Sequence, residues 1–166
     1  MAHLNENQII DYLRRSYTAV DGLWFMKVEE KLGFDAALEV DGQVWKVMPK
    51  IQARKLKSLL KVETGLEALL KCFTAKLTLD GFQFNIDMDD KQTYFRIIVN
   101  RCPWLDLLVK SGRENLARKV SDTICRQEYA VWAAEFGEDL RFELREQTCS
   151  CSGCCVLCFS STGETA

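Results

Sequence analysis

Apolar residues recur at every third or fourth position from Ile9 to Leu32, a spacing that is typical of an amphipathic helix. Asn5 and Gln8 have the spacing of a capping box just before this stripe, and Gly33 follows its last residue. A glycine directly after a periodic apolar run is a common helix stop. The pattern therefore predicts a helix over residues 6–32.

The same period continues after Gly33 and predicts two more helical stretches. Apolar positions from Val40 to Leu60 keep the three- and four-residue spacing, with Asp35 as a possible cap before them. Pro49 interrupts this stretch, so we expect either a kink or a new helix with proline in its first turn. A shorter helix is predicted from Gly65 to Leu77.

The period then changes to two, which indicates strands. Apolar residues alternate with polar ones from Phe82 to Met88 and again from Phe95 to Val99, on either side of the sequence DDKQ. This pattern predicts a β-hairpin with one buried face. Alternation from Leu140 to Leu144 predicts a third strand, and the sequence CCVLCF at 154–159 predicts a fourth.

Helical patterns also fill the interval between the hairpin and the later strands. We expect a short helix in the sequence WLDLLVKSG and a long one from Glu114 to Phe136. The predicted fold class is α+β, with N-terminal helices packed on an antiparallel sheet of about four strands and the long helix between the hairpin and the C-terminal strands. Residues 1–160 are expected to form a single domain, and residues 161–166 a disordered tail.

Composition narrows the classes of partner. The chain has 166 residues, of which 48% are hydrophobic and 28% charged, enough for one core. Its 22 lysines and arginines are scattered against 24 acidic residues, so no basic stripe for nucleic acid is present. The sequence contains no run of about 18 apolar residues, the length that a membrane-spanning helix needs. We expect a cytoplasmic monomer or homodimer, with no nucleic acid or membrane partner.

Five of the eight cysteines fall within the ten positions from Cys149 to Cys158. In a reducing compartment such thiols are more often free, metal-bound or redox-active than joined in structural disulfides. The CxxC pairs here do not open a helix after an apolar strand, and that helix is what activates a thioredoxin-type thiolate. The spacing also matches no ferredoxin-type run, although an iron–sulfur cluster stays open.

Side-chain parity selects a metal-binding set from these residues. A third strand that continued past Leu144 would bring Glu146 to the buried face, where a carboxylate needs a partner. Cys125 lies on the apolar stripe of the long helix, and Cys155 shares the parity of Leu157. Three thiolates and a carboxylate suit tetrahedral zinc. The predicted zinc ligands are Cys125, Glu146, Cys149 and Cys155.

Three other interpretations of the cysteines stay open. Free cysteine is often a small core residue, which is the simpler interpretation of Cys72 and of Cys125 taken alone. Cys158 is the replacement ligand if the strand register differs by one residue. Cys102, before Pro103, could be an extra ligand or a nucleophile.

The frame Glu146-x-x-Cys149, followed by Gly153 and a cysteine before an apolar strand, resembles the zinc motif of the 4-vinyl reductase domains. Those are small-molecule-sensing α+β domains. In those domains the last two cysteines of the motif are farther apart in sequence than Cys149 and Cys155, but closer than Cys149 and Cys158. The resemblance therefore leaves open whether Cys155 or Cys158 is the fourth ligand. The segments DGLWFMKVEEKLGFDAALEVDGQVW and NRCPWLDLLVKSGRE are similar to L-2-amino-thiazoline-4-carboxylic acid hydrolase-like proteins.

These resemblances imply two functions. The first is a zinc-binding, sensor-like domain that binds a small-molecule ligand and has a cysteine-rich structural metal site. The second is a zinc- or thiol-dependent hydrolase of a small carbon–nitrogen substrate, for which the sequence names no catalytic residue. The single histidine, His3, lies near the N-terminus, so histidine-based catalytic triads have no support.

Overall fold

The computed structural model describes residues 3–146 and 155–162. Contacts within the chain group it into two compact units, Met1–Gln43 and Val44–Ala166. The single domain expected over residues 1–160 stays a prediction. Within the described residues, no helix has both the length and the apolar character needed to cross a bilayer.

The first unit begins with α1 (Glu6–Leu32), which starts and ends where the sequence predicts. The capping box is confirmed, because the Asn5 side chain accepts from the Gln8 backbone N–H at 2.9 Å and the Gln8 side chain accepts from the Asn5 N–H at 2.9 Å. Gly33 has φ +86°, a conformation that glycine adopts with little strain. This turn leads into α2 (Phe34–Val44).

The second unit begins with α3 (Met48–Leu60) and α4 (Leu66–Asp80), which pack against each other. Pro49 lies in the first turn of α3, so a new helix, and not a kink, is the correct alternative of the two predicted. The helix α4 continues three residues past the predicted end at Leu77. Gly81, with φ +87°, ends it.

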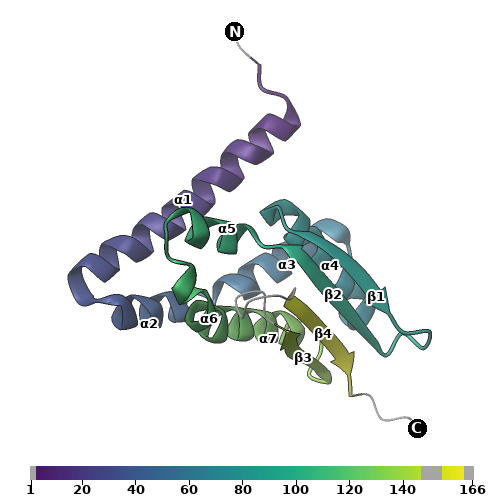
Figure 1. Ribbon diagram of the computed structural model, residues 1–166. Helices are drawn as coiled ribbons and strands as arrows, with labels where there is room; N and C mark the ends of the chain where they lie inside the picture. The colour runs from purple at the N-terminus through teal and green to yellow at the C-terminus, as the bar shows by residue number, and fades with distance from the viewer. Residues whose placement is uncertain (1–2, 147–154, 163–166) are drawn as a thin grey trace. The chain divides into compact units, whose positions relative to one another are not determined.

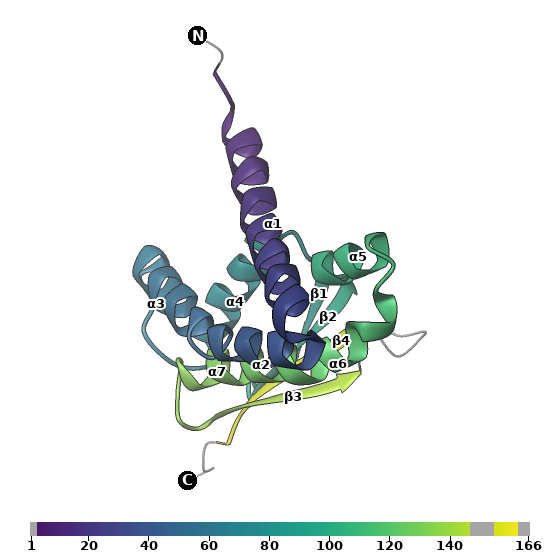
Figure 2. The same cartoon turned by 90° about the vertical axis from the view of Figure 1, so that its left-hand side faces the viewer.

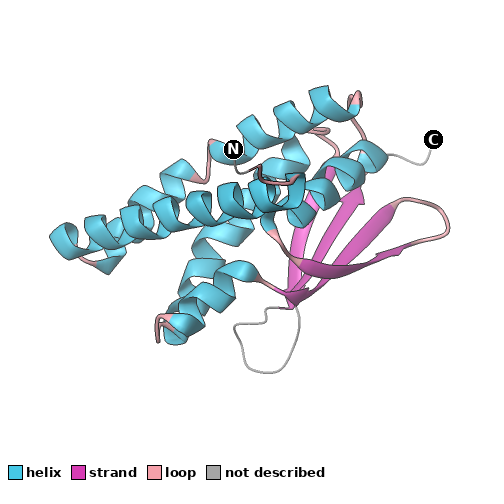
Figure 3. Cartoon of the chain, turned by 90° about the horizontal axis from the view of Figure 1, so that it is seen from above, coloured by secondary structure: helices cyan, strands magenta, loops and turns pink. Residues whose placement is uncertain are grey.

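A four-stranded antiparallel sheet follows, and its strands lie side by side in Figure 3. The strands are β1 (Gln83–Met88), β2 (Tyr94–Arg101), β3 (Leu140–Glu146) and β4 (Cys155–Ser161). Their spatial order is β1-β2-β4-β3. The last strand in sequence is therefore inserted between β2 and β3 and pairs with both.

The interval between β2 and β3 is helical, as predicted (Figure 1). The helix geometry changes along this interval. The helix α5 comes first, and a continuous helical run follows it. The segments are α5 (Pro103–Lys110), the 3₁₀ turn η1 (Glu114–Leu116), α6 (Ala117–Val120), the π-helical segment η2 (Ser121–Cys125) and α7 (Arg126–Ala134). The single long helix predicted from Glu114 to Phe136 is thus divided by a π-helical segment.

One face of the sheet is buried under α4 and α7, and α7 lies along β3 (Figure 2). Phe73 of α4 is fully buried at the centre of this core. Its ring meets those of Tyr129, Trp132 and Phe159 edge-on, with centroids 5.3, 5.4 and 5.0 Å away. Edge-to-face contacts of this kind stabilise aromatic cores beyond the area they bury.

The predicted α+β class is confirmed, with helices before the sheet, four antiparallel strands, and a helical run between the hairpin and the C-terminal strands. At the C-terminus, β4 extends into the segment expected to be a tail. The Ser161 N–H donates to the Thr93 carbonyl at 3.0 Å, and the Thr162 N–H donates to the Asp139 carbonyl at 2.9 Å. Residues 161 and 162 thus belong to the sheet end.

Replacing Phe73 with alanine should lower the free energy of unfolding by roughly 3 to 5 kcal/mol, because it leaves a cavity among the three aromatic rings. Urea unfolding measures this change. Leu79→Ala, on the same helix at a residue that is 50% exposed, is the matched control and should change stability by only about 0.5 kcal/mol. Equal effects of the two substitutions would contradict the assigned core.

Candidate functional site

Three strand ends meet at one end of the sheet. The register pairs Val99 of β2 with Cys155 at the start of β4, and Glu146 at the end of β3 with Val156. Cys102 follows directly after β2 and precedes α5. The sheet therefore brings Cys102 and Cys155, which are far apart in sequence, to the same end.

The π-helical segment η2 carries Cys125, its last residue. Segments of this geometry are rare and are found frequently at functional sites. The Ser121 hydroxyl, at the start of the same segment, forms a hydrogen bond with the Cys125 thiol. The π-helical segment thus contains one of the predicted zinc ligands, Cys125.

Cys102, Cys125 and Cys155 each pack against the edge of the hydrophobic core and affect one another's pKa; we call these three residues the thiol cluster. Burial raises the pKa of Cys125 far above its ordinary value, and the charges that Glu128, Cys102 and Cys155 can carry raise it further. Burial also raises the pKa of Cys102 to about 11, against the opposing effect of the backbone N–H groups that begin α5. Burial therefore favours the neutral form of both thiols.

A buried ion pair between α4 and α7 adjoins this cluster. Lys76 is 3% exposed, and its Nζ lies 2.6 Å from Oε1 of Glu128 and 3.2 Å from Oδ2 of Asp80. Burial alone would lower the pKa of Lys76, but the charges of Glu128 and Asp80 outweigh burial and raise it. The ammonium also lies 5.5 Å from the ring centroid of Tyr129, within cation–π distance.

The ion pair and the thiol cluster form one electrostatic network. Glu128 raises the pKa of Cys125, one turn earlier on the same helical run, whereas Lys76 lowers that of Cys102. Burial raises the pKa of Tyr129, and the thiols and Glu128 add to this effect. When a divalent cation that prefers sulfur binds to such thiols, each thiol releases its proton. The positive charge of the cation would then offset the repulsion among the thiolates.

Of the four predicted zinc ligands, Cys125 and Cys155 both pack against the edge of the core and interact electrostatically. Cys149 lies outside the described residues, and so does the side chain of Glu146. The backbone of Glu146 is described, and a β-bulge between Leu144 and Glu146 interrupts the alternation from which its buried position was predicted. Its register partner is Val156, one residue from Cys155.

Cys158 lies on the other face of the sheet from Cys155. It pairs with Arg96 and Glu143, whereas Leu157 and Phe159 on either side of it enter the core. The register thus brings Cys155, and not Cys158, to the thiol cluster. Within residues 3–146 and 155–162, no three histidine, cysteine, aspartate or glutamate side chains are close enough together to hold a metal ion.

The sequence analysis did not identify the ion pair, although the sequence holds a signal for it. Lys76 continues the buried stripe of Cys72 and Phe73 at the spacing of a helix turn. Glu128 is placed in the same way between Cys125 and Tyr129. A lysine and a glutamate that each occupy an inward-facing stripe position indicate a buried pair, because neither charge is stable there alone.

The comparisons with known proteins find a family but no activity. The model of a family described as "Family of unknown function (DUF6125)" matches residues 2–154. No curated protein and no solved structure matches the chain.

Replacing Lys76 with methionine should lower the free energy of unfolding by about 3 to 5 kcal/mol, because Glu128 is left buried without its cation. Thermal or urea unfolding measures the loss. Adding Glu128→Leu to the same variant should recover a large part of it, since both charges are then gone.

Lys71→Met is the matched control for this prediction. Lys71 belongs to the same helix and pairs with Glu67, but both side chains are more than half exposed. Its loss should change stability by at most about 0.5 kcal/mol. If the two lysine variants were equally stable, Lys76 would not be the buried partner of Glu128.

Proposed function

The chain belongs to DUF6125, a family of unknown function, and we propose that it is a zinc-binding domain of sensor type that recognises a small molecule. In this proposal a cysteine-rich structural site holds one zinc ion at the end of the sheet where β4 begins. We place the protein in the cytoplasm, as a monomer or a homodimer, because a reducing compartment keeps thiols available to a metal.

The observation that carries this proposal is the convergence of Cys125 and Cys155 from a helical segment and a strand. Buried cysteines that act only as small hydrophobic residues have no reason to lie close together in the fold. These two interact electrostatically with each other and with Cys102. Thiolates are soft ligands, and zinc accepts sulfur together with carboxylate oxygen.

We propose that Glu146 and Cys149 complete the coordination of the zinc ion. Glu146 is the last residue of β3, and Cys149 follows it by three positions in the sequence. Cys102 is the proposed replacement if either of the two is not a ligand, because it already lies beside the other thiols.

Four protein ligands leave no open coordination position, which is the arrangement of a structural zinc site. Such an ion would join η2 and α7 to the strand ends and would offset the repulsion among the anionic ligands. The free energy of metal binding would then add to the free energy of folding.

The charge pair beside Cys125 favours a second candidate, a hydrolase of a small carbon–nitrogen substrate. A perturbed cluster of titratable groups next to a thiol is a common feature of active sites. That function needs three protein ligands, with Glu146 off the metal, because zinc supplies Lewis acidity only at an open position. Glu146→Gln separates the two candidates: a structural site loses zinc and stability, whereas a hydrolase stays folded and loaded but inactive.

Single substitutions Cys125→Ala and Cys155→Ala should each lower the zinc content of protein purified without chelator, because each removes one ligand of the proposed site. Elemental analysis measures the content. Cys72→Ala is the control: Cys72 is a fully buried thiol of the core, and its loss should leave zinc unchanged. A double variant without Cys125 and Cys155 that still held stoichiometric zinc would exclude this site.

Removing the metal with a chelator should lower the melting temperature of the unsubstituted protein by roughly 5 to 10 °C. A ligand present at about 100 times its Kd adds about 2.7 kcal/mol, and each kcal/mol corresponds to about 2–4 °C at this chain length. Differential scanning calorimetry measures the shift. The Cys125→Ala variant should not respond to the chelator, and a response of equal size there would contradict the prediction.

A further inference from the structure

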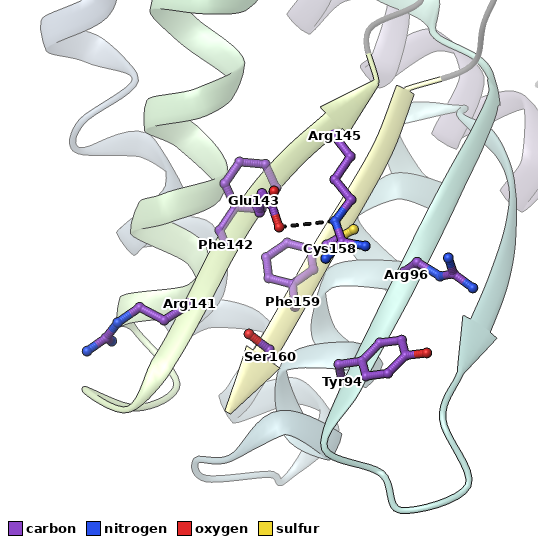
Figure 4. A pocket seen from close by; sticks show the side chains of 9 residues that line it. All are labelled: Tyr94, Arg96, Arg141, Phe142, Glu143, Arg145, Cys158, Phe159 and Ser160. Carbon is purple, nitrogen blue, oxygen red and sulfur yellow. Dashed lines mark hydrogen bonds and ion pairs between the residues drawn. The ribbon is translucent and has the colours of Figure 1, made fainter. Parts of the chain in front are cut away.

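Charged side chains line the sheet face opposite the core, and Figure 4 shows them on β2, β3 and β4. Most of their charge is paired on the sheet itself. Arg96 pairs with Asp87 of the neighbouring strand β1. Arg145 pairs with Glu143 at 3.1 Å. Arg96 and Arg141 point away from each other in Figure 4, so this face offers no site that both guanidinium groups share.

The helix α1 has a surface of the opposite character, because it is apolar. Over its whole length, all of which the structure describes, α1 has no buried residue. Six of its apolar side chains are between 43% and 68% exposed. They lie on one side of the helix because they recur at three-, four- and seven-residue spacing. We call them the α1 stripe: Ile9, Tyr12, Leu13, Val20, Leu23 and Trp24.

The other side of α1 is the side that packs within the first unit. The ring of Phe25 meets that of Phe34 of α2 edge-on, with centroids 5.8 Å apart. Asp11 and Thr18 precede Phe25 at seven-residue spacing, on the same side of the helix, and both are half-buried. The α1 stripe therefore faces away from the contact between α1 and α2.

Oppositely charged residues mark the two ends of the α1 stripe. Glu6 precedes Leu13 by seven residues, and its exposed side chain is therefore on the side of the stripe. Lys27 follows Val20 by seven residues and is exposed on the same side. Lys27 pairs with Glu30 of its own helix, but both side chains are more than half exposed. Because such a surface pair contributes little, a carboxylate of a partner can replace it.

We infer that α1 binds α1 of a second copy of the chain, antiparallel, along the α1 stripe. In this arrangement Glu6 of each copy faces Lys27 of the other, and the apolar residues pack between these two contacts. A parallel pair would put Glu6 beside Glu6 and Lys27 beside Lys27, and like charges oppose such a pairing. The antiparallel contact is the same on both copies, so it closes as a dimer.

The α1 stripe is large enough for this contact. The six side chains together expose on the order of 500 Å², and α1, with 27 residues, is roughly 40 Å long. The polar residues beside the stripe bring the contact toward the approximately 800 Å² that each partner buries in an interface of standard size. Apolar patches of several hundred Å² on a protein surface mark sites of protein contact. The inference is independent of the proposed zinc site.

Sedimentation equilibrium of the full chain tests the inference. The unsubstituted protein should form a dimer at micromolar concentration or below, as interfaces of this size do. Val20→Glu should weaken the dimer about tenfold or more, because it puts a charge at the middle of the apolar contact. Val109→Glu, at a residue of α5 that is 55% exposed, is the matched control and should leave the dissociation constant unchanged.

Both valine variants should stay folded, because each substitution is at an exposed helical position and glutamate is the better helix former. Circular dichroism checks their helix content. Both should also keep the zinc content of the unsubstituted protein, so that failure of the dimer contact and failure of the metal site are told apart.

Reversal of the end charges tests the orientation of the two helices. Glu6→Lys and Lys27→Glu should each weaken the dimer about threefold to tenfold at low salt, because each creates two like-charge contacts. The double variant should recover the affinity, since both contacts are attractive again. In a parallel dimer each single substitution would replace one like-charge contact with another and would hardly change the dissociation constant.

Four results would overturn the inference. The first is a monomer at every concentration, which would show that no second copy covers the α1 stripe. The second is a dimer that Val20→Glu does not weaken, because that dimer would use another surface. The third is equal weakening by both valine variants. The fourth is the absence of any effect of the two single charge reversals, which would exclude the antiparallel arrangement.

Discussion

The insertion of β4 between β2 and β3 is the constraint on which the second unit depends. A strand that pairs on both sides fixes the register of its two neighbours. Leu157 and Phe159 then close the core over Phe73, while Cys155 is held at the strand end beside Cys102. Because side chains alternate along a strand, the same register carries Cys158 to the opposite face. The core and the thiol cluster thus depend on the same strand register.

The buried polar groups of the interior lie next to the proposed metal site. Lys76 and Glu128 are both buried, and Nζ of the lysine lies 2.6 Å from Oε1 of the glutamate. A buried ion pair gives little net stability compared with apolar residues of the same size. Its presence between α4 and α7, next to the π-helical segment that carries Cys125, fits a role in fixing charge around the thiols. The proposed zinc ion would add a second link between the same helical run and the strand ends.

Local signals predicted much of the fold. The capping box and Gly33 predicted both ends of α1, because these signals lie within a few residues of the helix ends. Alternation predicted three of the four strands, and the sequence CCVLCF indicated the fourth. Pro49 marked the first turn of α3, whereas α4 continues three residues past its predicted end. The strand order, the bulge at Glu146 and the π-helical segment were not predicted, because each depends on pairing or packing with distant residues.

In the candidate site, too, local sequence patterns predicted some features, whereas others depend on the tertiary structure. Parity along β4 correctly put Cys155 on the core side, whereas the parity of Glu146 depended on an uninterrupted strand, which the bulge interrupts. Cys125 packs against the core, as its position on the apolar stripe of the helix predicted. Lys76 and Glu128 lie on such stripes too, but their partnership joins α4 to α7 and required the tertiary structure. X-ray absorption at the zinc edge of the purified chain tests the central claim most directly. The account predicts one zinc per chain with sulfur neighbours at about 2.3 Å, and a protein without stoichiometric zinc, or with zinc bound only by nitrogen and oxygen, would contradict it.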